Sequence, residues 1–506
     1  MHWTGHALVD VGIAGLCALA GRSEPESLQD SDLDNAAAWM EKQYYSGALT
    51  SYLTCVFMNS SFVQPNERPA KRQAFIDGYV KAHRAAPQAS VAGQRCAFSG
   101  EPATAPLVRT HLPLFSGEGV INFRPEGSTF VPAAGPYIVA LMFLPMASRR
   151  SEGKLLAVHA DDPNLTIRFA RRYLEDNQRL LALPLPTTRA PTHPGFDREI
   201  PAWDAQKKRY KFADAKGPRS LVMHDLTSIA AEARPSDLRP RPTDVTAYLL
   251  SNSGQGPSLD MFHLPGGLVS FVAQAAGAST AGAWEAISLR FRPVLEMDDD
   301  AAARGKAKKK RGGIMIAGRA GWTRNPAFEE LCGIYDAGFT DKVAAARWLR
   351  RHVLGRKDRD EKTKATYERG DARNWKLAEL FLMEVLGMKK GRIDAIRGFA
   401  DKLADHIRRT TDKKLYNALM FDPLFELQHA LRRVQRESAG GDLLFGLDEY
   451  TNVWLHEDAD KFLVRDLICI RVVERLHALG YFASHPEDAL PKEDAGSEPE
   501  AQEASS

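Results

Sequence analysis

The spacing of hydrophobic positions predicts helices at both ends of the chain. In residues 1–90, Leu8–Leu19 is an apolar run that is expected to form a buried helix, and Pro65–His83 is expected to be a basic amphipathic helix after its prolines. In the last third, apolar residues recur every three or four positions, most clearly in Arg392–Arg409. The residues of that stripe are Ile393, Ile396, Ala400, Leu403 and Ile407. Helices with this pattern pack as a bundle with a charged exterior.

Between these helical parts the pattern is mixed. Residues 91–150 are rich in glycine and proline, which predicts loops and small strands before a helix near Tyr137–Leu144. Further on, Leu155–His159 and Ser220–Met223 are expected to be strands, whereas Leu165–Leu181 is expected to be a helix with a basic face. The sequence therefore predicts an α+β fold, in which a mixed N-terminal region with short strands and helices is followed by an all-helical C-terminal bundle.

The length of the chain predicts several domains. A chain of 506 residues is longer than a single hydrophobic core usually serves, so about two to four domains are expected. The changes of pattern divide the chain into a helical N-terminal segment (1–90), an α+β domain (91–335), a helical bundle (336–485) and a disordered acidic tail (486–506).

The stretch Val245–Pro265 has the pattern of a hairpin with a glycine-rich loop. Two apolar runs flank Ser251–Ser258, which contains two glycines. Glycine permits positive φ and the close approach of another backbone. The amides of Asn252 and Gln255 are expected at the tip of the loop, where they can donate and accept hydrogen bonds at once. An ordinary long hairpin loop explains the same pattern.

The overall composition adds little to this picture, but the cysteines are informative about the compartment. The chain is 44% hydrophobic and 26% charged, with a net charge of +3, as is usual for a soluble globular protein. Its five scattered cysteines argue for a reducing compartment and against a disulfide framework. The N-terminal apolar run lacks the preceding positive charge of a secretory signal, and no other run is long enough to span a membrane. We therefore expect a cytoplasmic protein without a membrane partner.

Positive charge is concentrated in one short segment. Arg304–Arg311 places six basic residues in eight positions, shortly after the acidic stretch Glu296–Asp300 and directly before two glycines. No apolar periodicity runs through this segment, so a loop is expected. Basic residues beside glycines can bind a phosphate backbone, although a solvated surface loop is the alternative.

Motifs for catalysis and metal binding are absent from the sequence. No P-loop, His-Glu-x-x-His or Gly-x-Ser-x-Gly motif occurs, and His224-Asp225 lacks recognisable partners for metal-dependent hydrolysis. Cys96–Gly100 has the shape of half a zinc knuckle, but Ser99 replaces the second thiolate and no second cysteine pair follows. We therefore predict no catalytic residues, no metal and no cofactor, and expect a knuckle-like turn at Cys96.

The remaining features are typical of nucleic-acid binding. Lysine and arginine neutralise phosphates without reading sequence, whereas an amide on a glycine-rich loop can enter the minor groove or wedge between base pairs. The outer face of the helical bundle is also basic, although such a face is usually only solvated. The candidate DNA-binding residues are Asn252, Ser253, Gln255, Lys308, Lys309, Lys310, Arg311, Arg350, Arg351, Arg408 and Arg409.

Four stretches together resemble one protein family. They are Trp3-Thr4-Gly5-His6 followed by Asp10–Ala14, Cys96–Gly100 followed by Asn122–Pro125, Tyr248–Pro257 closing at Leu264-Pro265, and the C-terminal bundle. With these, nearly the whole chain resembles the large subunit of type I CRISPR Cascade complexes. The most similar branch is that of type I-B and Myxococcus-type systems, which includes a fruiting-body developmental protein. The first and third stretches are the more specific ones.

The resemblance implies a subunit without enzymatic activity. In this family the large subunit lies at the foot of a crRNA-guided complex, beside the subunit that holds the crRNA 5′ handle. It recognises the protospacer-adjacent motif on double-stranded target DNA, helps to start strand separation and recruits a helicase-nuclease. Cascade backbone subunits and a small subunit are further implied partners, and base pairing with the guide supplies the main sequence specificity. Members of the family carry paired Cys-x-x-Cys knuckles, of which this chain keeps only Cys96.

Two other classes of function stay open. One is a free-standing nucleic-acid-processing enzyme with a diffuse active site, and the other is a structural protein of a developmental assembly that binds only protein. Neighbouring genes for backbone subunits and a helicase-nuclease would favour the Cascade subunit over both.

Overall fold

The computed structural model describes most of the chain, which divides into two compact units. The first contains the described residues up to Ala345, and the second contains those from Ala346 onward. The described residues are 1–64, 66–115, 129–151, 153–182, 202–204, 209–211, 217–232, 243–252, 257–288, 325–353, 375–437, 443–455, 461–485 and 488.

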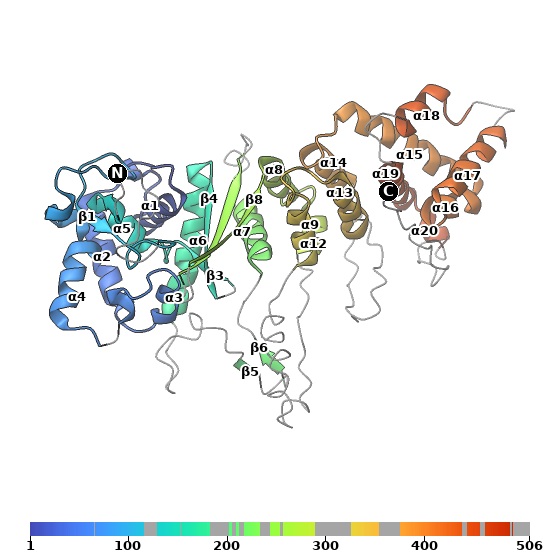
Figure 1. The fold of residues 1–506 in the computed structure, drawn as a ribbon. Coiled ribbons are helices and arrows are strands. Elements are labelled where there is room, and N and C mark those ends of the chain that lie inside the picture. The colour runs from blue at the N-terminus through green and yellow to red at the C-terminus, as the bar shows by residue number, and fades with distance from the viewer. Residues whose placement is uncertain are drawn as a thin grey trace, which may run out of the picture. The chain divides into compact units, whose positions relative to one another are not determined.

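Two apolar helices form the core of the N-terminal part of the first unit (Figure 1). Helices α1 (Ala7–Ala20) and α5 (Gly135–Phe143) are mostly buried and pack against each other. Their backbones approach so closely that a Cβ atom on Gly12 would lie 2.1 Å from the carbonyl oxygen of Ala140, so only glycine fits there. The helices predicted at Leu8–Leu19 and near Tyr137–Leu144 are confirmed.

Shorter helices surround this pair. Helices α2 (Asp30–Tyr44) and α3 (Thr50–Thr54) precede α4 (Pro69–Phe75), which continues into the π-helical turn η3 (Ile76–Val80). Turns of 3-10 helix are η1 (Pro25–Ser27), η2 (Ser61–Val63), η4 (Ala82–Arg84) and η5 (Ala89–Val91). The helix predicted over Pro65–His83 thus begins at Pro69 and is broken into three pieces. Residues on both sides of position 90 share one hydrophobic core.

A four-stranded antiparallel sheet lies against this core. Its strand order is β3-β4-β7-β8. The strands are β3 (Arg149–Ser151), β4 (Lys154–Ala160), β7 (Val245–Ser251) and β8 (Ser258–Leu264). Helix α6 (Pro163–Ala182) packs on β4 and α1, and the strand predicted at Leu155–His159 is confirmed. Two small sheets pair β1 (Ala105–Leu107) with β2 (Val131–Ala133) and β5 (Ala202–Asp204) with β6 (Arg209–Lys211).

The strand predicted at Ser220–Met223 is wrong, because these residues belong to helix α7 (Pro218–Glu232). All four of them are buried, and a short apolar run does not distinguish a buried strand from a buried helix. Helix α7 packs against α8 (Gly266–Ala275) and α12 (Pro326–Gly333). Helix α9 (Ala281–Ser288) also packs against α12.

The described part of the second unit is helical. It begins within α13 (Lys342–Trp348), which continues into the π-helical turn η7 (Leu349–Val353). The following helices are α14 (Trp375–Glu384), α15 (Lys390–Thr410), α16 (Lys413–Met420), α17 (Leu424–Glu437), α18 (Leu447–Trp454), α19 (Lys461–Ala478) and α20 (Tyr481–Ser484). Helix α15 packs along α19, and every residue of the predicted apolar stripe is 0% exposed. The predicted α+β class, with strands in the N-terminal half and helices in the C-terminal region, is confirmed.

Candidate nucleic-acid interface

The predicted hairpin is present as strands β7 and β8. The two strands pair from Val245 opposite Leu264 to Ser251 opposite Ser258. Residues 253–256, which include the candidates Ser253 and Gln255, lie outside the described residues. The described structure therefore defines the base of the loop.

The placement of Asn252 at the tip of the loop is wrong. Its side chain is 0% exposed, and its backbone N–H donates a hydrogen bond to the carbonyl oxygen of Cys55 at 2.7 Å. Its amide nitrogen donates to the carbonyl oxygens of Val56 at 3.3 Å and of Arg109 at 3.4 Å. Asn252 therefore anchors the base of the loop to Cys55, Val56 and Arg109 instead of presenting an amide to a ligand.

A second turn lies at the same end of the sheet. Strand β4 runs antiparallel to β7, so the β3–β4 turn and the β7–β8 loop leave the sheet on the same side. Cys55 contacts both, because its thiol donates to the carbonyl oxygen of Gly153 at 3.2 Å while its own carbonyl accepts from Asn252. Gly153 has a φ of 71°, which a non-glycine residue adopts only with strain. The two turns are thus held together, and we call this region the anchored sheet end.

Positively charged side chains come from the elements that surround the anchored sheet end. Arg109, a half-buried residue, supplies a carbonyl to Asn252, and one of its guanidinium nitrogens lies 4.0 Å from the Met58 sulfur. Arg150 pairs with Leu155 in the strand register, which places it on β3 close to this end, and Lys154 forms an ion pair with Asp260. Asp260 thus neutralises Lys154, and Arg109 and Arg150 are the cations here that could contribute to a positive potential around the loop.

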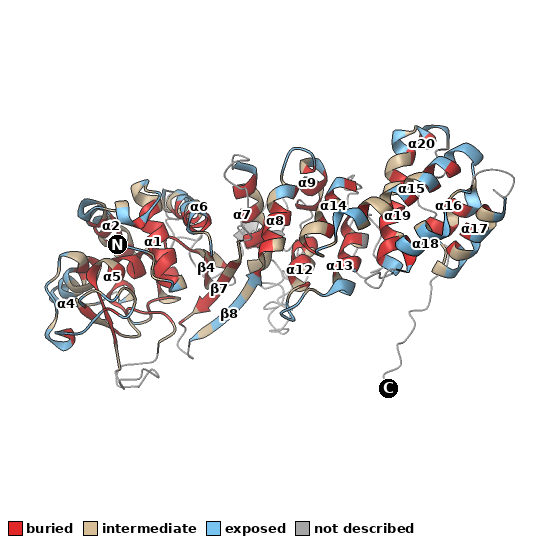
Figure 2. Cartoon of the chain, turned by 90° about the horizontal axis from the view of Figure 1, so that it is seen from above, coloured by how far each residue is buried: buried red, intermediate tan, exposed pale blue. Residues whose placement is uncertain are grey.

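Strand β8 forms an edge of the sheet, with β7 as its neighbour among the described strands. Figure 2 shows β8 mostly in pale blue and tan beside the red, buried β7. Leu259 is 42% exposed and Met261 is 62% exposed, although both are hydrophobic. Exposed apolar residues on an edge strand are typical of a surface that another molecule covers.

The helical bundle presents a second group of cations. Arg408 and Arg409 are exposed on the last turn of α15, where they complement the helix dipole. Lys413 and Lys414 begin α16, where the dipole disfavours positive charge. We call these four residues the basic turn. Within the described residues, Arg408, Arg409 and Lys414 have no ion pair, so their charges face solvent.

The other candidate residues have no described position that supports a role in binding. Lys308, Lys309, Lys310 and Arg311 lie outside the described residues. Arg350 and Arg351 belong to the π-helical turn η7, in which Arg351 is half-buried and the Arg350 side chain is not described. Among the candidates, the structure therefore describes the side chains of Asn252, Arg351, Arg408 and Arg409.

The knuckle-like turn expected at Cys96 is present. The Cys96 N–H donates to the carbonyl oxygen of Glu101 at 2.7 Å, and the Gly100 N–H donates to that of Cys96 at 3.0 Å. The thiol is buried and lies 3.4 Å from the backbone nitrogen of Phe98. Within the described part of the chain, no three His, Cys, Asp or Glu side chains gather in an arrangement that could hold a metal ion.

The N-terminal motif forms a polar turn around the buried Asp10. Both oxygens of the Asp10 carboxylate accept hydrogen bonds from the preceding residues, from the backbone and hydroxyl of Thr4 at 2.8 and 2.7 Å and from the Gly5 N–H at 2.9 Å. Burial alone would raise the pKa of Asp10, but His159 and the Thr4 hydrogen bonds outweigh it and lower the pKa. His6 caps α1 by accepting from the Val9 N–H. This turn ties the first residues of the chain to β4 through His159.

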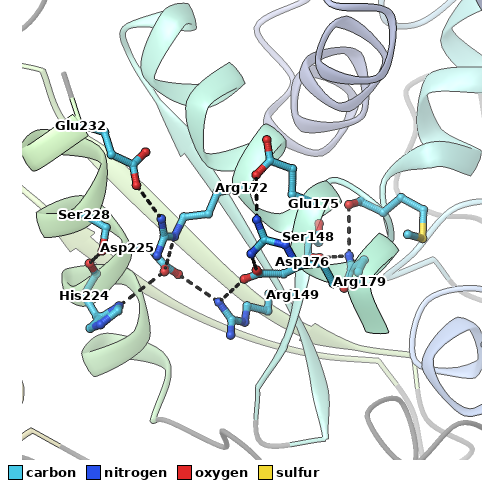
Figure 3. A network of polar contacts seen from close by, with 12 residues as sticks. Ser148, Arg149, Arg172, Glu175, Asp176, Arg179, His224, Asp225, Ser228 and Glu232 are labelled. Carbon is cyan, nitrogen blue, oxygen red and sulfur yellow. Dashed lines mark hydrogen bonds and ion pairs between the residues drawn. The ribbon is translucent and has the colours of Figure 1, made fainter. Parts of the chain in front are cut away.

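Sequence reasoning missed a buried ionic network between α6, α7 and β3 (Figure 3). Asp225 on α7 is 0% exposed and accepts from the Arg172 Nε atom at 2.9 Å. Arg149 lies 3.0 Å from Asp176 and 3.7 Å from Asp225, and Arg172 also pairs with Glu232 at 3.3 Å.

Burial raises the pKa of Asp225, but His224, Arg149 and Arg172 outweigh that effect, and the pKa is lowered. The network holds α6 and α7 against the sheet, so the contacts of Asp225 give the His224-Asp225 pair a structural role. The only signal in the sequence was an acidic residue within the apolar run of α7.

No protein-family model, no curated protein sequence and no solved structure matches this chain. None of the described helices is both long enough and apolar enough to cross a bilayer.

Proposed function

We propose that this chain is the non-catalytic large subunit of a crRNA-guided type I CRISPR surveillance complex. It recognises the protospacer-adjacent motif in duplex DNA, promotes strand separation and recruits a helicase-nuclease. The observation that carries the proposal is the anchored sheet end, where Asn252 fixes the base of a glycine-rich loop beside Arg109. A loop that enters a DNA groove benefits from a rigid base, because less entropy is lost on binding.

The chemistry of the loop suits a groove or a base step. Gln255 can both donate and accept, and the two glycines allow the backbone to approach the DNA closely. Arg109 and Arg150 come from elements beside the loop and would neutralise the phosphates that flank it. The exposed Leu259 and Met261 would face a neighbouring subunit or the displaced bases.

The basic turn supplies the sequence-independent part of binding. Four cations within seven positions fit a phosphate backbone, either of the displaced strand or of the flanking duplex. Lys308, Lys309, Lys310 and Arg311 would add a further phosphate contact. In this proposal the crRNA, the Cascade backbone and crRNA-handle subunits and the small subunit are partners of the assembled complex.

The cysteines support a cytoplasmic location. All five are among the described residues and form no disulfide, and four of them are buried. Buried thiols that stay reduced are typical of a reducing compartment, where a complex that intercepts foreign DNA would act.

The proposal is tested by comparing Gln255→Ala with Ser258→Ala, a control at the same end of the hairpin. The binding partner is a motif-bearing duplex selected from a library with a randomised short motif. Gln255→Ala should weaken binding to the selected motif by about tenfold, the value of one lost base contact, and should leave random duplex unchanged. If motif and random duplex lose affinity equally, or neither does, the loop does not read the motif.

Phosphate binding and catalysis are tested separately. Changing Lys308, Lys309, Lys310 and Arg311 to alanine should weaken binding to all duplexes and flatten the dependence of affinity on salt. Co-purification of the chain with crRNA and backbone subunits would support the complex. Cleavage of DNA by the purified chain with Mg²⁺ or Mn²⁺ would favour the free-standing enzyme instead.

A further inference from the structure

Asp412, which lies in sequence between the two pairs of cations of the basic turn, is already bound by other groups. Asp412 accepts a hydrogen bond from the Leu415 N–H at 3.0 Å and so caps α16. Both of its oxygens also accept from Arg433 on α17, at 2.9 and 2.8 Å. Arg433 thus neutralises Asp412, and Arg408, Arg409 and Lys414 remain as the cations of the basic turn that have no ion pair within the described residues.

The C-terminal segment leaves the bundle beside this turn. The Tyr416 hydroxyl donates to the backbone carbonyl of Asp488 at 2.8 Å, and the Tyr481 hydroxyl donates to its carboxylate at 2.9 Å. Lys413 lies 4.0 Å from the same carboxylate, whose side chain is 11% exposed. Tyr416 follows Lys413 by three positions on α16, so Asp488 is fixed within one helical turn of the basic turn.

The residues that follow Asp488 are strongly acidic. Residues 489–506 contain five carboxylates and a single lysine, which leaves four negative charges in excess. The carboxylates are Glu493, Asp494, Glu498, Glu500 and Glu503. Fully extended, these eighteen residues reach about 60 Å, far more than the length of α16. We call residues 489–506 the acidic tail.

We propose that the acidic tail docks on the basic turn and competes there with the phosphates of nucleic acid. The anchor at Asp488 holds the tail near the cations at an effective concentration in the millimolar range. The tail then excludes weakly bound, non-specific DNA from the basic turn, whereas a target DNA that makes further contacts with the protein displaces the tail. The competition rests on the nucleic-acid binding proposed above, but the docking of the tail does not.

Docking is tested without DNA by zero-length carbodiimide cross-linking of the full chain, followed by mass spectrometry. The contact between Lys413 and Asp488 provides an internal positive control. Cross-links should join Lys413 or Lys414 to Glu493, Asp494 or later tail carboxylates, and they should fade as salt screens the attraction. If the control link forms while tail links go only to lysines elsewhere, the docking is wrong.

Competition is tested with a full-length variant in which the five tail carboxylates become amides (E493Q, D494N, E498Q, E500Q and E503Q). These residues lie outside the core, so the fold should not change. At about 50 mM salt the variant should bind random duplex about fivefold more tightly than the wild type, and this gain should disappear at about 0.5 M salt. Adding R408A and R409A should remove the gain, since the tail and the DNA would then have lost the same site.

The outcomes separate the two proposals. If neither the wild type nor the tail variant binds DNA but the tail cross-links to Lys413 or Lys414, the proposed function is wrong and the docking stands. If both bind DNA equally at low salt, the competition is wrong while the proposed function is unaffected.

Discussion

Replacing Asn252 with alanine should loosen the contact of the base of the β7–β8 loop with Val56 and Arg109. The substitution removes two side-chain hydrogen bonds, of 3.3 Å to Val56 and 3.4 Å to Arg109, while the backbone bond to Cys55 remains. A hydrogen bond contributes about 0.5–1.5 kcal/mol net, and both of these are long. The expected loss is therefore about 1–1.5 kcal/mol, which corresponds to about a tenfold change in the local opening equilibrium.

Hydrogen exchange followed by mass spectrometry measures this opening. Peptides that cover Val245–Ser251 and Ser258–Leu264 should exchange about tenfold faster in Asn252→Ala at their loop ends, whereas peptides from α15 should not change. Ser258→Ala is the control, because no hydrogen bond of its side chain occurs within the described residues. Unchanged exchange in Asn252→Ala would refute the anchoring role. The preference of the protein for motif-bearing over random duplex should fall together with the protection of the hairpin from exchange, because a more flexible loop loses more conformational entropy on binding.

Two further substitutions test how the first unit is held together. Asp225→Asn should lower the free energy of unfolding by about 3 kcal/mol, because it leaves Arg172 and Arg149 beside an uncharged group. The pKa of Asp225 in the folded state is lowered, so this loss of unfolding free energy should be largest above about pH 5 and should shrink as the pH falls below about 4. Denaturant titrations of both proteins at several pH values measure the difference. A difference that does not depend on pH would contradict the ionic role of Asp225. Gly12→Ala should destabilise the first unit by more than about 2 kcal/mol, because the added Cβ atom would lie 2.1 Å from the Ala140 carbonyl oxygen. A melting temperature equal to that of the wild type would exclude this close contact.

The candidate site was only partly predictable. The hairpin followed from its two apolar runs and the turn residues between them, and the structure confirms both strands. The burial of Asn252 did not follow, because its hydrogen-bond partners Val56 and Arg109 lie 196 and 143 positions away. An asparagine beside a loop has the same sequence pattern whether it faces the core or solvent.

The charged residues show the same division. The pattern placed Arg408 and Arg409 on the outside of a helix, and their exposure confirms it. The structure shows that Lys413 and Lys414 begin α16, which the local pattern of charges alone does not decide. The position of Asp488 beside this helix depends on its hydrogen bond with Tyr416, which lies 72 positions earlier in the chain.

By itself, the sequence determined the helical spacing of the bundle, the buried first helix and the α+β class. These properties repeat every two to four residues and are local in the chain. It could not distinguish a strand from a buried helix at Ser220–Met223, where the apolar run is too short to show a period. Only the tertiary structure decided that Asn252 is an anchor, that Asp225 is the centre of an ionic network and that the acidic segment starts beside the basic turn. Each of these depends on contacts between elements far apart in sequence, which the local pattern does not encode.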